Sequence, residues 1–203
     1  MTRARRPQDW ARDLASARGV ESMVASVLHA SELVSELEDH TADFDRLDFS
    51  FLWKGGRVWL DVKEKRQRYS AGIGSLWPER RAEDLFVIDE TVFRRIVWQG
   101  GGGYLAVHDV PGGRWAYFGP WELTLGPRRR YNRWIEKAPG NRLRKGKILL
   151  DLSTAPVVAD SFSVEAVGEP VDRARAGRDQ LAGIEIGLDP LPDVGDGPGR
   201  GVR

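Results

Sequence analysis

Two runs of alternating apolar and polar residues, separated by a pair of glycines, constrain this chain more than any other feature. Residues 46–67 read RLDFSFLWKGGRVWLDVKEKRQ. A Gly-Gly pair between two such runs predicts a β-hairpin, because glycine readily adopts the positive φ angles of tight hairpin turns. If Gly55 and Gly56 form the whole loop, Lys54 pairs with Arg57, and every other cross-strand pair follows from that register.

This register gives the predicted hairpin one apolar and one polar face, because side chains alternate along a strand. On the polar face, Asp48 lies opposite Lys63, and Ser50 lies opposite Asp61. Opposed Cβ atoms are about 5 Å apart and diagonal ones about 7–8 Å apart. We therefore predict that Asp48, Asp61 and Lys63 form a compact cluster, which depends on the glycine pair being the turn. The apolar face carries Phe49, Phe51, Trp53, Val58, Leu60 and Val62.

Two carboxylates and a lysine on one sheet face suit a hard divalent cation and phosphodiester hydrolysis. Mg²⁺ binds carboxylate oxygens, retains several waters and also takes phosphate oxygens of a substrate. Such an ion lowers the pKa of a bound water, and a neighbouring lysine positions that water or helps to deprotonate it. The alternative is an ordinary cross-strand ion pair between Asp48 and Lys63, worth less than about 1 kcal/mol on a solvated face.

The rest of the chain predicts a mixed α/β protein with a sheet flanked by helices. Apolar residues at helical spacing predict a helix over 20–37, although 32–38 (ELVSELE) could instead form a short strand. Residues 1–19 read as a basic leader with a short helix, residues 20–167 as a single domain, and residues 168–203 as a disordered tail. Further elements are predicted as strands at 85–88, 104–109, 114–119 and 147–152, and as a helix that follows Asp89 and ends at glycines 100–103.

An aspartate on one strand and Asp-x-Lys on the next, after a helix that bears a glutamate, resemble the PD-(D/E)xK nuclease superfamily. The matching residues are Asp48 and Asp61-Val62-Lys63. The resemblance covers roughly residues 20–110 and implies a restriction-endonuclease-like αβββαβ core, here with extra C-terminal strands. In this chain Leu47 stands where the family has proline, and the family's first strand is very short or absent.

The resemblance also implies roles for individual residues. Asp48, Asp61 and the carbonyl of Val62 would coordinate Mg²⁺ or Mn²⁺, and Lys63 would be the catalytic lysine. The glutamate of the helix would be Glu21, with Glu32 or Glu36 as the alternatives if the helix is placed differently.

A basic segment after residue 127 is the candidate surface for nucleic acid. Tyr131 and Trp134 are interleaved with its cations, as in surfaces that bind phosphates and stack bases, although a solvated charged surface has the same composition. We assign Arg128, Arg129, Arg130 and Arg133, together with Lys65 on the hairpin, as nucleic-acid contacts. The full set of cations is Arg128, Arg129, Arg130, Arg133, Lys137, Arg142, Arg144, Lys145 and Lys147, opposed only by Glu136.

The composition excludes several other classes of protein. The chain has no cysteine, which removes disulfides, thiol nucleophiles and Cys-ligated zinc. No apolar run approaches the ~20 residues of a membrane span, and the basic N-terminus lacks the apolar segment of a signal peptide. The expected location is therefore the cytoplasm, without membrane attachment. His40 lies in an acidic stretch (EDHTADFD) and is expected to be part of a solvated connector.

The function that the sequence predicts is a Mg²⁺-dependent nuclease acting on DNA, with RNA as the alternative substrate. The principal rival is a non-catalytic nuclease-like module that binds nucleic acid or a protein partner. A third hypothesis is a ligand-binding β domain, since the chain has eight tryptophans. The sequence leaves open whether the protein is a monomer or a homodimer.

Overall fold

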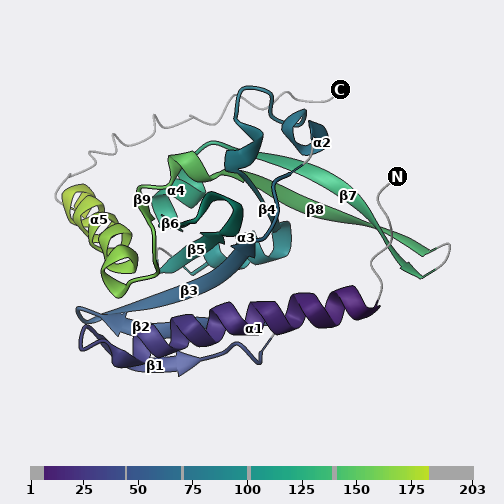
Figure 1. Ribbon diagram of the computed structural model, residues 1–203. Helices are drawn as coiled ribbons and strands as arrows, with labels where there is room; N and C mark the ends of the chain where they lie inside the picture. Colours follow the sequence, from purple (N-terminus) through teal and green to yellow (C-terminus); the bar gives the residue numbers. More distant parts are fainter. Residues whose placement is uncertain (1–6, 44, 70, 100–101, 139–140, 183–203) are drawn as a thin grey trace, which may run out of the picture.

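The predicted hairpin forms two central strands of a six-stranded mixed sheet (Figure 1). The computed structural model describes residues 7–43, 45–69, 71–99, 102–138 and 141–182. The strands of this sheet are β1 (Val34–Asp39), β2 (Phe49–Trp53), β3 (Gly56–Lys65), β5 (Gly103–Asp109), β6 (Arg114–Phe118) and β9 (Val157–Ala159). They lie in the order β1-β2-β3-β5-β6-β9. β3 and β5 run parallel, and the other neighbouring strands are antiparallel.

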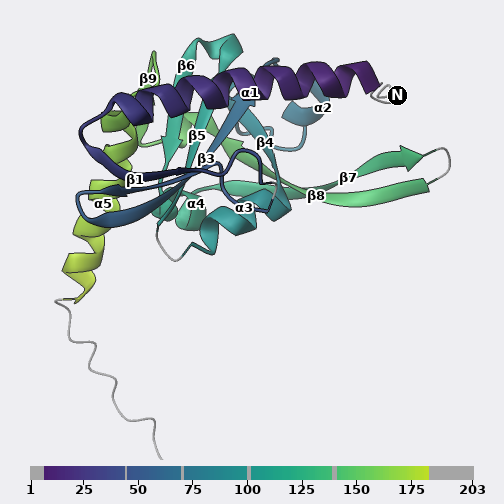
Figure 2. The ribbon, with the colours of Figure 1, turned by 90° about the horizontal axis from the view of Figure 1, so that it is seen from below.

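A second sheet of three strands packs against one face of the first. It consists of β4 (Leu85–Asp89), β8 (Asn141–Asp151) and β7 (Arg128–Ala138), in the order β4-β8-β7. The strand predicted at 147–152 is therefore only the end of β8. The long β7–β8 hairpin was not predicted, and it extends well beyond the body of the molecule (Figure 2).

Helices cover both faces of the six-stranded sheet, which confirms the predicted mixed α/β architecture. One face packs against α1 (Pro7–Ala30) and α5 (Val164–Ala182), through a core that includes Phe49, Phe51 and Leu60. The opposite face packs against the second sheet, α3 (Glu90–Val97) and α4 (Pro120–Leu125). The shorter elements are α2 (Ala71–Gly74) and the 3₁₀ turns Ala82–Asp84, Val110–Gly112 and Leu152–Thr154. Within the described ranges, no helix is long and apolar enough to cross a membrane.

The N-terminal region differs from the predicted helix over 20–37. The helix begins at Pro7, ends at Ala30 and is followed by strand β1, so the strand alternative for 32–38 is confirmed in outline. Proline suits a first helical position because that position needs no amide hydrogen. The first strand, expected to be very short or absent, has six residues and pairs with β2.

The turn of the central hairpin differs from the prediction by a shift of two residues. Trp53 pairs with Gly56, so the loop is Lys54-Gly55, whose φ angles are 47° and 76°. The predicted Gly55-Gly56 loop is therefore wrong, and so is the Lys54–Arg57 pair. A register shift of two residues leaves every side chain on its predicted face, because strand side chains alternate with a period of two.

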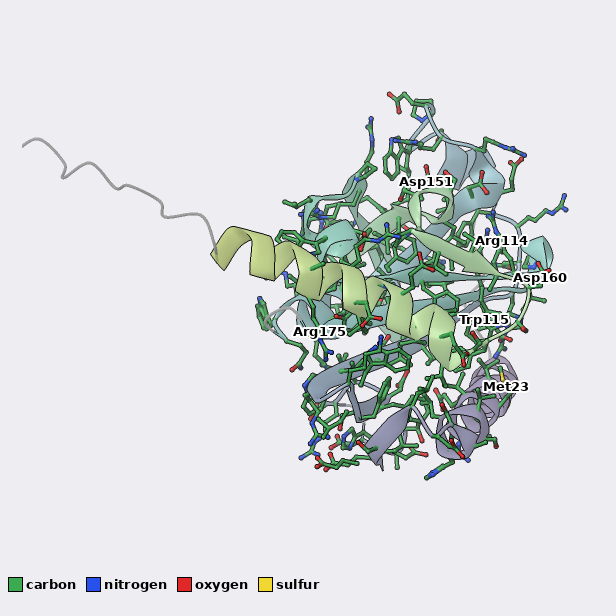
Figure 3. All side chains as sticks on the ribbon, turned by 90° about the vertical axis from the view of Figure 1, so that its left-hand side faces the viewer. Met23, Arg114, Trp115, Asp151, Asp160 and Arg175 are labelled. Carbon is green, nitrogen blue, oxygen red and sulfur yellow. The ribbon has the colours of Figure 1, made fainter. Side chains whose placement is uncertain are left out.

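Helix α5 contacts the turn of the central hairpin. Arg175 of α5, labelled in Figure 3, donates hydrogen bonds to the carbonyls of Trp53 and Lys54, at 2.6 and 3.2 Å. Its guanidinium occupies the space that a Cβ on Gly56 would need. Gly56 leaves room for this guanidinium, and the positive φ angles of the turn belong to Lys54 and Gly55.

Part of the expected disordered tail is helical. Residues 168–182 belong to α5, and residues 183–203 lie outside the described part of the chain. Glycine and proline in 168–170 suggested disorder, but the indole of Trp53 lies where a Cβ on Gly168 would be. This glycine thus allows a close approach between the helix and the hairpin.

Candidate active site

Asp48, Asp61 and Lys63 lie together and form what we call the carboxylate–lysine cluster. The Lys63 ammonium nitrogen is 2.7 Å from Asp61 Oδ2 and 3.3 Å from Asp48 Oδ2. It also donates a hydrogen bond of 2.9 Å to the carbonyl oxygen of Val62. The convergence predicted from the alternation of the hairpin is therefore present, even though the turn is different.

The backbone of the hairpin holds Asp48 at the start of β2. The Val62 amide donates a 2.7 Å hydrogen bond to Asp48 Oδ2, and the Asp48 carbonyl accepts one of 2.9 Å from the amide of His40. Asp48 is therefore fixed to β3 through its side chain and to the connector after β1 through its backbone. Its side chain is only 15% exposed, so it is oriented rather than freely solvated.

Asp61 is the most deeply buried carboxylate of the cluster. Burial raises its pKa from 3.8 to about 6, Lys63 opposes that rise, and Asp48 adds to it. Asp61 Oδ2 is inaccessible to solvent and accepts no hydrogen bond of good geometry, although Lys63 Nζ lies close to it. A buried carboxylate oxygen without a hydrogen-bond partner is costly unless another group compensates its charge.

Lys63 is held in its charged form. Burial lowers the pKa of its ammonium, but Asp61 and Asp48 raise it more, so the net pKa lies above the ordinary lysine value. Its side chain is 31% exposed, so the cluster opens to solvent on the lysine side. A lysine that stays protonated can donate hydrogen bonds and supply positive charge, but it cannot accept a proton from water at neutral pH.

Of the three candidate helix glutamates, Glu21 is the one coupled to the cluster. It lies on α1, is half-buried, and has a pKa raised first by burial and then by Asp48, with Lys63 opposing the rise. Glu32 lies in the turn after α1, and Glu36 lies on β1, where it forms a 2.6 Å ion pair with Arg57. The structure thus favours Glu21 over both alternatives.

A polar network beside the cluster was not predicted. Ser50, on the same face as Asp48, donates a 3.0 Å hydrogen bond to Glu38, and His40 Nε2 lies 3.2 Å from the Ser50 hydroxyl. The His40 ring stacks on Trp59, and its side chain is 9% exposed, so His40 is not part of a solvated connector. The only sequence signal was the position of Ser50, two residues after Asp48.

The residues present fit a divalent cation of the Mg²⁺ type. The cluster offers the carboxylates of Asp48 and Asp61 and the Val62 carbonyl. Among the described residues there is no group of three or more His, Asp or Glu side chains in a metal-binding arrangement. Mg²⁺ is commonly bound by one or two carboxylates and keeps several waters, so it does not require such a group.

Lys65 was wrongly assigned to the nucleic-acid surface. Its side chain is 1% exposed, pairs with Asp109 at 3.1 Å and donates a hydrogen bond to the Glu83 carbonyl. It belongs to the interior, although it shares a strand face with Lys63. The cause is the neighbouring strand β5, whose Asp109 is the cross-strand partner of Lys65.

The four predicted arginine contacts lie on β7, and three of them bind groups of the protein itself. Arg128 donates to the carbonyls of Thr124 and Gly126, and its guanidinium lies over the Phe93 ring. Arg129 pairs with Glu79 at 3.2 Å, Arg130 pairs with Glu90 at 2.9 Å, and Arg133 is exposed.

Comparison with known proteins supplies no relative for this chain. A scan against models of protein families found no match, and searches of curated proteins and of solved structures likewise found none. The function of the chain must therefore be inferred from the geometry and chemistry of its own residues.

Proposed function

We propose that this chain is a metal-dependent nuclease that hydrolyses phosphodiester bonds in DNA. Asp48, Asp61 and the Val62 carbonyl would hold Mg²⁺ or Mn²⁺, Lys63 would serve the attacking water, and Glu21 would assist. The observation that carries the proposal is the convergence of Asp48, Asp61 and the Val62 carbonyl within 3.3 Å of the Lys63 ammonium nitrogen, on a side that opens to solvent.

The charge balance of the cluster supports a cation rather than a simple ion pair. Asp48 and Asp61 contact Lys63, Glu21 interacts electrostatically with Asp48 and Lys63, and Arg95 acts on Asp61 more weakly than Lys63 or Asp48. Asp48 raises the pKa of both Glu21 and Asp61, and Lys63 opposes each rise. A bound divalent cation would supply the missing positive charge, lower the pKa of a coordinated water and stabilise the charge of the transition state.

Lys63 acts in this proposal as a fixed, protonated donor. Its ammonium contacts the Val62 carbonyl, Asp48 and Asp61, and its side chain is 31% exposed, so the charge is fixed at the side of the cluster that opens to solvent. From there it would orient the attacking water and stabilise charge on a phosphate oxygen. Its raised pKa argues that the proton of the water is taken by another group.

The order of elements also supports the proposal. Along the chain, α1, β1, β2, β3, α3 and β5 follow the αβββαβ order expected of a restriction-endonuclease-like core, with β3 parallel to β5. β4 interrupts this order but belongs to the second sheet. The aspartate precedes the second strand and the Asp-Val-Lys motif lies on the third, as the family resemblance requires.

The test compares cleavage of plasmid and single-stranded DNA with Mg²⁺, with Mn²⁺ and with chelator. Asp61→Asn and Lys63→Ala should each lower the rate by on the order of 100-fold or more, the usual cost of removing one group that stabilises a transition state. Lys54→Ala is the matched control, because Lys54 pairs with Asp172 at 2.7 Å in an exposed position away from the cluster.

Two results would contradict the proposal. Cleavage that is unchanged in Asp61→Asn and Lys63→Ala would remove the cluster as the active site. Salt-dependent binding of DNA by the unaltered chain, without cleavage under any metal condition, would instead support a non-catalytic module that binds nucleic acid.

A further inference from the structure

The outer part of the β7–β8 hairpin, residues 132–138 and 141–146, projects from the molecule and is called the arm (Figure 2). Strand β4 supports β8 only from Lys147 to Asp151. Beyond that point β7 and β8 pair only with each other among the described strands. A two-stranded ribbon without a supporting layer is marginally stable in isolation, so its length requires an explanation beyond folding.

The hairpin concentrates positive charge. Residues 128–147 contain nine Lys or Arg residues and one acidic residue, in a chain whose net charge is +1. The rest of the chain is therefore net acidic, and the basic character of the protein is located in this hairpin. Such an asymmetry is the electrostatic signature of a surface that meets phosphates.

Carboxylates of the body pair with cations at the base of this hairpin and with Lys145, an arm residue close to the body. Glu79 and Glu90 hold Arg129 and Arg130, and Asp89 holds Lys145 at 2.9 Å. Arg133 and Arg144 are exposed, and neither forms an ion pair with any carboxylate whose side chain the structure describes. The cations that remain available to a partner thus lie in the arm.

An exposed tryptophan lies among these cations. Trp134 is 63% exposed and is directly opposite Arg144 on β8, so the indole and the guanidinium share one face of the arm. A strand tryptophan usually packs in a core or an interface, where its large apolar area is removed from water. An aromatic ring beside unpaired arginines is the arrangement by which proteins stack unpaired bases while binding the phosphate backbone.

We propose that the arm binds single-stranded nucleic acid, with Trp134 stacked on an unpaired base and Arg144 contacting a neighbouring phosphate. The inference rests on the proposed function for the identity of the polymer, and it narrows the substrate to DNA that contains an unpaired segment. A base in a duplex presents only its edges, whereas an unpaired base exposes the flat face that an indole stacks on. A polyanion fits better than a protein partner, because residues 128–147 hold nine Lys or Arg residues and one acidic residue.

The test measures anisotropy of labelled DNA, with chelator present so that no strand is cut. The two probes are an oligothymidine of about 16 nucleotides, the upper end of common site sizes, and a blunt-ended duplex of two fully complementary strands. The unaltered chain should bind the oligothymidine more tightly at equal salt. Trp134→Ala should weaken that binding by roughly 5- to 100-fold and Trp134→Phe should retain most of it, because stacking needs only an aromatic face.

Matched controls separate stacking from general effects. Trp98 is 74% exposed after α3 and off the arm, so Trp98→Ala should leave binding of both probes unchanged. Arg144→Glu should weaken binding and reduce its salt dependence, whereas Arg173→Glu on α5 should not. Near-native circular dichroism and thermal midpoints for all variants establish that each one is folded.

Three outcomes would overturn the inference. The first is that Trp134→Ala binds the oligothymidine as tightly as the unaltered chain. The second is that Trp134→Ala loses duplex binding by the same factor as oligothymidine binding. The third is that light scattering shows a dimer that Trp134→Ala converts to a monomer. The last result would mean that the arm joins copies of this chain. If the protein cleaves DNA but Trp134→Ala binds the oligothymidine as tightly as the unaltered chain, the role of the arm is refuted and the nuclease proposal stands. If binding depends on Trp134 but no DNA is cleaved, the nuclease proposal is refuted and the role of the arm stands.

Discussion

Lys63 and Lys65 are two residues apart on the same face of β3, and each lies against a buried aspartate, yet their surroundings differ in charge. Lys65 faces Asp109 at 3.1 Å, and Arg114 also binds Asp109, at 3.2 Å. Asp84 in turn binds Arg114, so two cations meet two carboxylates. Around Lys63, by contrast, the carboxylates of Asp48 and Asp61 both contact the one ammonium, and Glu21 interacts electrostatically with Asp48 and Lys63.

The comparison shows which observation distinguishes a functional cluster from a structural one. A buried carboxylate oxygen without a hydrogen bond of good geometry does not distinguish the two lysine sites. Asp61 Oδ2 beside Lys63 and Asp109 Oδ1 beside Lys65 both have this property. Solvent exposure and charge balance do distinguish them. Lys65 and Asp109 are both 1% exposed and their charges cancel, whereas Lys63 is 31% exposed and its cluster carries more negative than positive charge. A closed neutral pair stabilises one conformation, whereas an open acidic cluster can accept a cation.

The largest expected effect would come from breaking the closed pair. Asp109→Asn should lower the free energy of unfolding by about 3–5 kcal/mol, because it leaves the Lys65 charge buried without its partner. Denaturant titration checks this value, and Lys54→Ala, which breaks an exposed pair, should cost less than about 1 kcal/mol. Equal losses in the two variants would contradict the contrast between buried and exposed pairs.

A smaller effect is expected when a cation binds the open cluster. Saturating Mg²⁺ or Mn²⁺ should raise the thermal midpoint of the unaltered chain, by the equivalent of about 2.7 kcal/mol at a hundredfold excess over the dissociation constant. Asp61→Asn should abolish this increase, because it removes a ligand charge, while Asp109→Asn should keep it. A midpoint that does not respond to either metal in the unaltered chain would count against the metal site.

The smallest effect concerns pH. The folded-state pKa of Asp61 is raised from 3.8 to about 6, mainly by burial. Its contribution to stability is therefore fully present below pH 3.8 and is lost as the pH rises through about 6. Without metal, Asp61→Asn should remove this part of the pH dependence of stability. In the unaltered chain, the stabilisation by Mg²⁺ should grow between pH 3.8 and about 6, because Asp61 loses its proton over that range. Thermal melts of the unaltered chain and of Asp61→Asn between pH 4 and pH 8, with and without Mg²⁺, check both expectations. If the thermal midpoints of the two proteins follow the same pH profile, Asp61 is not the source of this pH dependence.

The regions that could be predicted are those where the pattern along the chain matches the packing. The alternation in residues 46–67 predicted which side chains share a face, and the apolar side of that pattern lies in the core. The arm was not predicted, because its described outer residues, such as Trp134, are exposed and provide no apolar alternation to detect. The helical part of α5 was missed because Gly168 suggested disorder where Trp53 actually packs.

By itself, the sequence determined that Asp48, Asp61 and Lys63 share one face of a hairpin, because strand alternation survives any register shift of two residues. Only the tertiary structure showed the turn, in which Trp53 pairs with Gly56 and Arg175 of a distant helix binds the carbonyls of Trp53 and Lys54. It also separated Lys63 from Lys65, which are alike in sequence pattern. That separation depends on β5, whose Asp109 closes over one lysine and leaves the other open to solvent.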